Sequence, residues 1–309
     1  MILDKSKFNL LKVLLSFSIG IFLVFYSLGD FEIKLFFESI SRANISLIFF
    51  SMIMLLLSIQ LRAIRWKFIL NKKIKVNDLY KAQLVGYMGN NIFPLRFGEL
   101  LKSFYVEKKN SISRYEVFGS VFIERLLDFL GLGFLFLLLL KTNWVDLIDS
   151  SYRSSLFFIF LASILALLIS FYLNRNFENS FINILPPPVK KILVGFSSIQ
   201  SKNLFLLFIL TILIWCSYIL IVYLVQYSFS LNLSYHQTVL LLLISTLALS
   251  IPGLPGNIGT FEASVVYTLG MFNIIDNFGF GFILHSVSFI PYTLFGIFYF
   301  IKERSVILK

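Results

Sequence analysis

The sequence predicts an all-α polytopic membrane protein, and this prediction rests on composition and on the length of the apolar runs. Of 309 residues, 58% are hydrophobic and only 14% are charged, and the mean hydropathy is +0.87. A soluble domain carries roughly 25% charged residues, so this chain cannot cover a globular surface with polar side chains. Its apolar residues occur in runs of about 17 to 25, the length that crosses about 30 Å of hydrocarbon. We therefore expect the chain to be embedded in a bilayer.

Six apolar runs are long enough to be full spans. They cover residues 10–28, 45–61, 117–140, 155–173, 204–229 and 279–301. Two further segments, 79–104 and 236–274, are apolar but interrupted by Pro and Gly, so we expect broken helices there. The first run follows Lys5, Lys7 and Lys12 without a small-residue cleavage site behind it. It is therefore predicted to be an uncleaved span and not a signal peptide.

The charges of the loops predict that both termini are cytoplasmic. If each broken segment returns to the side it left, the cytoplasmic stretches are 1–12, 62–116, 174–203 and 302–309. These stretches contain 21 of the 27 Lys and Arg residues, and the opposite side contains four. Basic residues concentrate on the cytoplasmic side of membrane proteins, so this orientation is favoured. The two broken segments then become opposed re-entrant elements.

The order of these elements repeats along one membrane domain over residues 1–309. The order span, span, broken segment, span occurs in the half-repeats 10–140 and 155–301, and the second half begins on the opposite side. An inverted repeat of this kind is typical of secondary transporters, whose sites lie near the bilayer midplane. Between the halves, three prolines precede apolar residues at helical spacing, which predicts a cytoplasmic interfacial helix over 188–202. An ordinary amphipathic connector is the open alternative.

The first broken segment carries two charged residues next to its helix breakers. It reads NNIFPLRFGE over residues 90–99. Pro94 lacks an amide hydrogen and Gly98 permits unusual backbone angles, so we expect unwound backbone here. Arg96 and Glu99 are expensive in hydrocarbon unless they have partners. We therefore predict that this segment, including Asn91, lines a buried or hydrated site.

The second broken segment, PGLPGNIGTFE over residues 252–262, has a similar character. Pro255, Gly256 and Gly259 are expected to unwind the chain, and Glu262 supplies a carboxylate. Each unwound stretch is followed by a helix N-terminus, which offers backbone N–H groups and partial positive charge to an anion.

A third charged cluster, Glu124, Arg125 and Asp128, lies in the cytoplasmic half of the third span. Glu124 and Asp128 share a helix face, and Arg125 can reach Asp128 three residues on. One interpretation is an ion-pair network that holds this span to the first broken segment. The other is that Arg96 and Arg125 bind a phosphate while neighbouring carboxylates, among them Glu99, orient them.

Arg62, Arg65 and Trp66 lie where the second span is predicted to meet the cytoplasm. Basic-aromatic clusters at such places are mostly interfacial anchors, and headgroup attraction is the alternative.

No cofactor, metal site or catalytic residue is predicted. His236 and His285 lack ligand-like neighbours in the sequence, and no nucleotide-binding loop, hydrolase elbow or Cys/His metal spacing occurs. An ATP-driven pump is therefore disfavoured. The net charge of +11 lies mainly in the loops, where it meets anionic lipid headgroups, so nucleic acid is not an expected partner.

Taken together, the motifs resemble the lysylphosphatidylglycerol synthase transmembrane-region family, whose members are also called flippase-like domain proteins. The motifs are Arg62-x-x-Arg65-Trp66, Asn91-x-x-Pro94-x-Arg96-x-Gly98-Glu99, Glu124-Arg125-x-x-Asp128 and Pro255-Gly256-x-x-Gly259-x-x-Glu262. The resemblance extends from about Leu10 to Lys302. It implies a membrane domain that moves lipids with polar headgroups between leaflets. Relatives that transfer lysine carry a soluble catalytic domain after this part, and the chain stops at Lys309, so lysyltransferase activity is not expected.

The resulting hypothesis is a lipid flippase of a prokaryotic inner membrane whose partners are lipids with polar or anionic headgroups. The residues expected to contact the headgroup or its phosphate are Arg96, Arg125, Glu99, Asp128, Glu262 and Asn91. The rival hypothesis is a membrane scaffold that transports nothing and assists a lipid-modifying enzyme or a glycosyltransferase. An enzyme acting within the membrane is a third class. The lipid, the energy source, the direction of transport and a homo-oligomeric state stay open.

Overall fold

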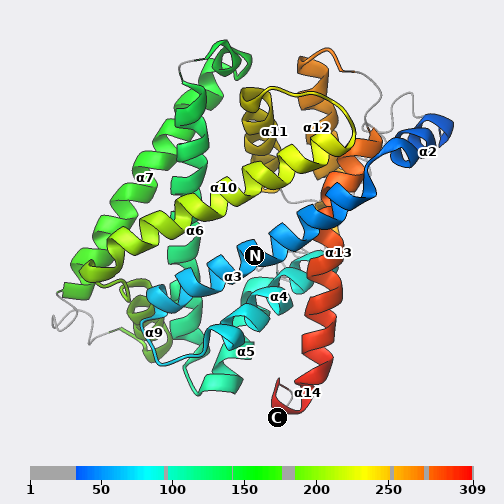
Figure 1. Cartoon of the computed structure of the whole chain (residues 1–309). Coiled ribbons are helices and arrows are strands. Elements are labelled where there is room, and N and C mark those ends of the chain that lie inside the picture. Colours follow the sequence, from blue (N-terminus) through cyan, green and yellow to red (C-terminus); the bar gives the residue numbers. More distant parts are fainter. Residues whose placement is uncertain are drawn as a thin grey trace, which may run out of the picture.

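The computed structural model describes residues 33–93, 97–140, 142–175, 185–250, 254–274 and 278–307 (Figure 1). These residues form helices and short connections, and no strand occurs among them, which confirms the all-α class. The first predicted span, 10–28, lies outside the described residues, and so do Pro94 and Arg96.

The helices follow one another in a regular order along the chain. They are α2 (Ile33–Arg42), α3 (Ile45–Leu70), α4 (Val76–Ile92), α5 (Gly98–Asn110), α6 (Arg114–Leu139), η2 (Asn143–Leu147), α7 (Ser150–Arg175), α9 (Pro187–Phe196), η3 (Ser201–Asn203), α10 (Leu204–Ser228), α11 (Tyr235–Ala248), η4 (Pro255–Asn257), α12 (Thr260–Met271), α13 (Phe278–Lys302) and α14 (Arg304–Ile307).

Four helices are long and apolar enough to cross a membrane, namely α3, α7, α10 and α13. They correspond to four of the six predicted spans. Helix α6 is also continuous over 26 residues, close to the predicted span 117–140. It is not among the four, because three charged residues, Glu124, Arg125 and Asp128, lie near its middle. Every stretch of α6 that is long enough to cross a membrane therefore contains all three. Helix α3 continues nine residues beyond the predicted end at 61.

Both broken segments are interrupted where their Pro and Gly residues predicted a break in the helix. The first consists of α4 and α5, and the second of α11 and α12 with the short turn η4 between them. In each segment the two helices pack against each other, so the chain folds back on itself. In the second break, φ is +70° at Gly256 and +85° at Gly259, a backbone region that glycine adopts far more readily than other residues.

The α4–α5 hairpin depends on close contact between backbones. A Cβ atom added at Gly98 would lie only 1.8 Å from the carbonyl oxygen of Gly86. The side chain of Asn90 accepts a hydrogen bond from the Gly98 amide at 2.9 Å, which satisfies one of the free N–H groups at the start of α5. Pro/Gly content and Asn90 together therefore account for the break between α4 and α5.

Eight of the described helices form two sets of four with matching contacts, α3–α6 and α10–α13. In each set the first helix packs on the second, the second on the third and the third on the fourth. The sets meet where α3 runs along α10 and where α4 packs against α13 (Figure 1). The contact of α4 with α13 has its counterpart in that of α11 with α6. Helix α4 also touches η4, so the two breaks are neighbours.

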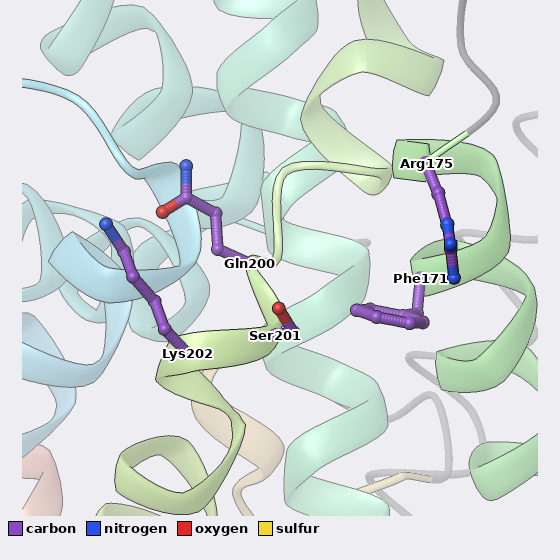
Figure 2. A pocket seen from close by; sticks show the side chains of 5 residues that line it. All are labelled: Phe171, Arg175, Gln200, Ser201 and Lys202. Carbon is purple, nitrogen blue, oxygen red and sulfur yellow. The ribbon is translucent and has the colours of Figure 1, made fainter.

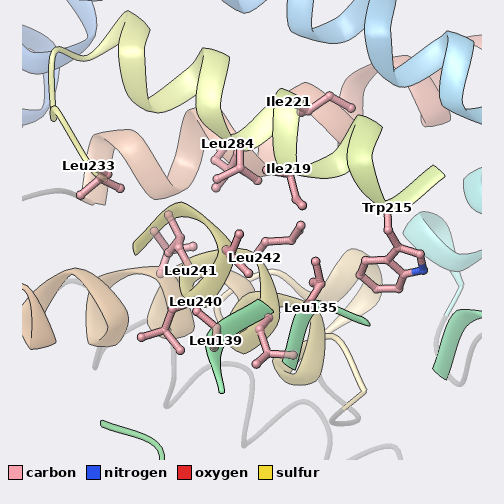
Figure 3. Packing of buried hydrophobic residues seen from close by; sticks show 14 of the residues in the cluster. Leu135, Leu139, Trp215, Ile219, Ile221, Leu233, Leu240, Leu241, Leu242 and Leu284 are labelled. Atoms are coloured by element: carbon pink, nitrogen blue, oxygen red, sulfur yellow. The ribbon is translucent and has the colours of Figure 1, made fainter. Parts of the chain in front are cut away.

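Two apolar cores hold these sets together. One lies mainly among α6, α10, α11, α12 and α13, where Leu135, Trp215 and Leu241 are almost fully buried (Figure 3). The other lies among α3, α4, α5 and α6 around Trp66. The charged residues predicted from the sequence are packed beside this second core.

The predicted interfacial helix 188–202 is shorter than expected. It forms α9 from Pro187 to Phe196, and a separate short turn, η3, follows at 201–203. A Cβ atom at Gly195 would lie 1.8 Å from the backbone oxygen of Glu116, and one at Gly119 would lie 2.0 Å from that of Ile192. Helix α9 therefore packs backbone against backbone on α6.

Candidate functional site

Seven charged side chains from three helices form one network, which we call the charged cluster. Helix α3 supplies two of them, α5 two and α6 three. Its members are Arg62, Arg65, Glu99, Lys102, Glu124, Arg125 and Asp128.

Asp128 is shared by three guanidinium groups. Its Oδ1 lies 2.6 Å from Nη2 of Arg65, and its Oδ2 lies 3.1 Å from Nη1 of both Arg62 and Arg125. The side chain of Asp128 is 14% exposed and that of Arg65 is fully buried. Paired and hydrogen-bonded charges can be accommodated in such surroundings, whereas a single one would be strongly unfavourable. Asp128 thus connects α6 to α3.

Lys102 connects α5 to α6 in the same manner. Its Nζ lies 2.6 Å from Oε2 of Glu124 and 3.1 Å from Oε2 of Glu99. The other oxygen of Glu99 lies 2.7 Å from Nη2 of Arg125, and Gln83 donates to Glu124 at 2.7 Å. This is the ion-pair network between the third predicted span and the first broken segment that one of the two interpretations proposed.

The structure corrects the expected role of Arg62, Arg65 and Trp66. Their exposed fractions are 5%, 0% and 0%, so they are not interfacial anchors with side chains reaching toward headgroups. The two arginines bind Asp128, and the indole of Trp66 donates to the hydroxyl of Ser120 at 2.9 Å. These partners lie more than 50 residues away along the chain, and the local pattern does not reveal them.

The charged cluster holds one more cation than it holds carboxylates. Most of its members are buried, but the side chain of Arg125 is 37% exposed. The Nε atoms of Arg65 and Arg125 are buried and have no hydrogen-bond partner within the described part of the chain. Arg125 is therefore the most exposed member of the cluster, and its guanidinium is the one that an anion from outside can approach.

Glu262 belongs to a different arrangement. Its Oε2 accepts a hydrogen bond from the Gly259 amide at 2.7 Å, which caps α12, and its Oε1 lies 2.6 Å from Nδ1 of His285. The ring of Phe261 stacks on His285 with 4.7 Å between centroids. His285 thus has a carboxylate partner that its neighbours in the sequence do not reveal. Among the described residues, no ion pair or hydrogen bond joins Glu262 to Arg125. The residues that were predicted to form one site therefore belong to two separate arrangements.

Asn91 lies at the contact between the two breaks. Its Nδ2 donates to the backbone oxygen of Phe289 at 3.3 Å and to the hydroxyl of Thr293 at 3.0 Å, both on α13. A Cβ atom at Gly256 would lie 3.4 Å from the backbone oxygen of Asn91. Asn91 thus joins the end of α4 to α13 next to η4.

Gln83, Lys102 and His285 are among the members of these arrangements to which the sequence assigned no role in the site. For Lys102 a signal existed, because it follows Glu99 by three residues and therefore shares its helix face. In the ranges that the structure describes, no three His, Cys, Asp or Glu side chains are grouped in a way that could hold a metal ion.

A further carboxylate, Glu303, joins the ends of three helices. Its oxygens lie 2.5 Å from Nζ of Lys81 on α4 and 3.1 Å from Nζ of Lys109 on α5, and the hydroxyl of Tyr105 donates to it at 2.5 Å. Burial alone would raise the pKa of Glu303, but the hydrogen bonds from Lys81, Tyr105 and Lys109 outweigh it. They lower the pKa from its ordinary value of about 4.5 to about 2.

Glu303→Gln is therefore expected to loosen the end of α13 from α4 and α5. A carboxyl whose pKa is lowered by folding stabilises the fold above its ordinary pKa, and this contribution is lost as the pH falls through its folded pKa. The stability difference between wild type and variant should be largest above pH 4.5 and should shrink toward pH 2. Thermal unfolding in detergent at several pH values measures it. A difference that does not change with pH would contradict the assignment of the effect to this carboxyl.

Comparison with known proteins finds one matching family model and two related membrane proteins. A family model described as the lysylphosphatidylglycerol synthase TM region matches residues 9–296. A UPF0104 membrane protein of Methanocaldococcus jannaschii is 27% identical over 226 residues, covering 71% of this chain and 95% of that protein. Another UPF0104 membrane protein, from Methanothermobacter thermautotrophicus, is 25% identical over 254 residues, covering 74% of this chain and 73% of that protein.

No solved structure matches the chain at a significant level. The family match covers the motifs around Arg62, Arg125 and Glu262 and nearly all the described helices. This chain belongs to the lysylphosphatidylglycerol synthase transmembrane-region family, and it is a membrane protein.

Proposed function

We propose that the protein translocates lipids with phosphate-bearing or sugar-bearing headgroups between the leaflets of a prokaryotic plasma membrane. The observation that carries this proposal is the excess of one cation in the charged cluster, together with the partial exposure of Arg125. A lipid phosphate would balance that charge and would accept hydrogen bonds from the guanidinium. Glu99 and Asp128 would hold the guanidinium in place while the headgroup passes.

The proposed topology has six spans, two opposed re-entrant hairpins and cytoplasmic termini. The distribution of Lys and Arg supports it, as do the matching contacts within α3–α6 and α10–α13. Unwound backbone at membrane depth is tolerated where it is buried in protein or lines a hydrated cavity. The packing of α4 against η4 brings the two breaks together, as expected for a site between two halves of a transporter.

Arg96 and Glu262 are proposed to belong to the same pathway. Arg96 follows the break after α4, and on sequence grounds it is proposed as a second phosphate ligand. Glu262 and His285 are proposed to stabilise the second hairpin, because they join α12 to α13. Lysine transfer is not part of the proposal, since the matching family model describes a membrane region.

A non-transporting scaffold is the second candidate function. It is favoured by the extent of internal pairing, since every carboxylate of the charged cluster already lies within 3.1 Å of a cation. Such a cluster would hold α3, α5 and α6 rigid and present the membrane domain to a lipid-modifying enzyme or a glycosyltransferase.

Arg125→Gln is expected to slow lipid translocation by about tenfold or more, because a charge-assisted hydrogen bond contributes roughly 1.5–3 kcal/mol. The fold should persist, since Glu99 keeps Lys102 and Asp128 keeps Arg62 and Arg65. The measurement is the exposure of headgroup-labelled lipids in proteoliposomes that contain the purified protein alone.

Arg114→Gln is the matched control, because Arg114 is 52% exposed and its ion-pair partner Glu107 is 3.8 Å away. Its rate should equal that of the wild type. An unchanged rate in Arg125→Gln would contradict the assigned site. No translocation by the wild-type protein alone would favour the scaffold.

A further inference from the structure

A second charged site lies apart from the charged cluster, in a cavity of about 430 Å³ at the end of α7. Its lining residues are Phe171, Arg175, Gln200, Ser201 and Lys202. Figure 2 shows Phe171 and Arg175 on α7 to one side and the segment from Gln200 to Lys202 to the other. The volume is in the range of small-molecule sites.

The charges of the lining residues suit an anion. Arg175 and Lys202 are both exposed, and the described residues that line the cavity include no carboxylate. Neither cation forms an ion pair with another residue that the structure describes. Gln200 and Ser201 add neutral groups that can donate or accept hydrogen bonds. Figure 2 shows the side chain of Lys202 directed away from Arg175. Both side chains are exposed, so Lys202 can turn toward Arg175, and a phosphate group between them would then meet two cations that have no ion-pair partner among the described residues.

The position of the cavity favours a lipid over a dissolved anion. The apolar stretch of α7 ends at Leu173, two residues before Arg175, and α10 begins at Leu204, two residues after Lys202. Both cations therefore lie where two apolar helices end, which is the level of the headgroups when such helices cross a bilayer.

Exposed apolar side chains lead away from the cavity along both helices. On α7, Tyr172 is 63% and Leu168 is 60% exposed, three and seven residues before Arg175. On α10, Phe205 is 75% and Phe208 is 59% exposed, three and six residues after Lys202. Residues three or four apart share a helix face, so each stripe continues from a cation of the cavity. Acyl chains can lie along these stripes while the headgroup occupies the cavity.

The wall of the cavity is held in place by contacts outside it. Ser170 donates to the backbone oxygen of Phe196 at 2.6 Å, which ties α7 to the end of α9. Asn203 donates to the backbone oxygen of Phe68 at 3.3 Å, which ties η3 to α3. Between these anchors, Ile199 is 1% exposed within the second apolar core. The segment that carries Lys202 is therefore positioned before any ligand binds.

We propose that this cavity binds the headgroup of an anionic phospholipid, with the phosphate between Arg175 and Lys202 and the acyl chains along α7 and α10. This lipid site is separate from the charged cluster and does not depend on translocation.

The test counts the lipids retained by the purified full chain. Native mass spectrometry would compare protein incubated with phosphatidylglycerol and with phosphatidylcholine. Each cation near a headgroup contributes a factor of about five, so the double variant Arg175→Gln/Lys202→Gln should bind phosphatidylglycerol up to about thirtyfold more weakly. Binding of phosphatidylcholine should change little.

Two further variants keep the test decisive. Lys73→Gln/Lys75→Gln removes two exposed charges elsewhere and should retain phosphatidylglycerol. Arg175→Lys/Lys202→Arg keeps both charges and should also retain it, which separates loss of charge from loss of fold. Unchanged phosphatidylglycerol binding in the double Gln variant, or an equal loss in the Lys73/Lys75 control, would overturn the site. Displacement of phosphatidylglycerol by millimolar inorganic phosphate would overturn the lipid as its ligand.

Discussion

Asp128→Ala is expected to destabilise the protein by about 3–5 kcal/mol, the range for removing one partner of a buried ion pair. The change would leave Arg62 and Arg65 buried without their carboxylate and would remove one of the two partners of Arg125. These arginines have few other acceptors. Arg62 donates to the hydroxyl of Tyr218 at 2.6 Å, and Arg65 donates to that of Thr211 at 3.2 Å. Neither acceptor carries a compensating charge.

The measurement is the free energy of unfolding in detergent, followed by the loss of helical signal. Asp146→Ala is the matched control, because Asp146 also pairs with an arginine, Arg153 at 3.0 Å, but is 70% exposed. Exposed pairs contribute little to stability, so this control should unfold like the wild type. Equal stability of the Asp128 and Asp146 variants would show that the charged cluster does not hold α3 to α6.

Gly98→Ala is expected to destabilise the α4–α5 hairpin by at least about 1–3 kcal/mol, the range for overpacking a close contact. The added Cβ would lie 1.8 Å from the backbone oxygen of Gly86 and 2.5 Å from Oδ1 of Asn90. The first atom belongs to the backbone of α4, which cannot rotate away as a side chain can. The two helices must therefore separate, and the side chain of Asn90 would lose its position as the acceptor for the Gly98 amide.

Gly270→Ala is the control for this prediction. Apart from the adjoining backbone of its own helix, no described atom would lie within 4 Å of a Cβ at Gly270, and alanine favours a helix over glycine by about 1 kcal/mol. This variant should therefore be as stable as the wild type or more stable. Both variants can be compared by thermal unfolding in the same detergent. A Gly98→Ala protein as stable as the Gly270→Ala protein would contradict the close contact between α4 and α5.

Much of the architecture could be predicted because it depends on local properties of the chain. The length of an apolar run decides whether a helix can cross a bilayer, and Pro and Gly interrupt a helix wherever they stand. Both broken segments were therefore located correctly. The end of α3 was placed too early, at 61 instead of 70, because the apolar run stops at Arg62 while the helix does not.

The roles of Arg62 and Arg65 show where local reasoning fails. A basic residue at the end of an apolar run can reach toward headgroups or turn into the protein, and both cases have the same sequence pattern. The outcome depends on Asp128, which follows Arg65 by 63 residues. His285 is a similar case, since its partner Glu262 lies on another helix, 23 residues away.

The sequence by itself determined that the chain is helical and membrane-bound, where its helices are broken, and which charged residues lie close to apolar surroundings. These properties follow from burial of apolar side chains and from backbone hydrogen bonding, both of which act over a few turns of helix. Only the tertiary structure decided which charges meet. It joined Asp128 to two arginines of α3 and Lys102 to Glu124, and it separated Glu262 from that cluster. Which charged side chains of different helices form ion pairs depends on which helix faces pack together. The packing of the faces depends in turn on all the contacts of the fold.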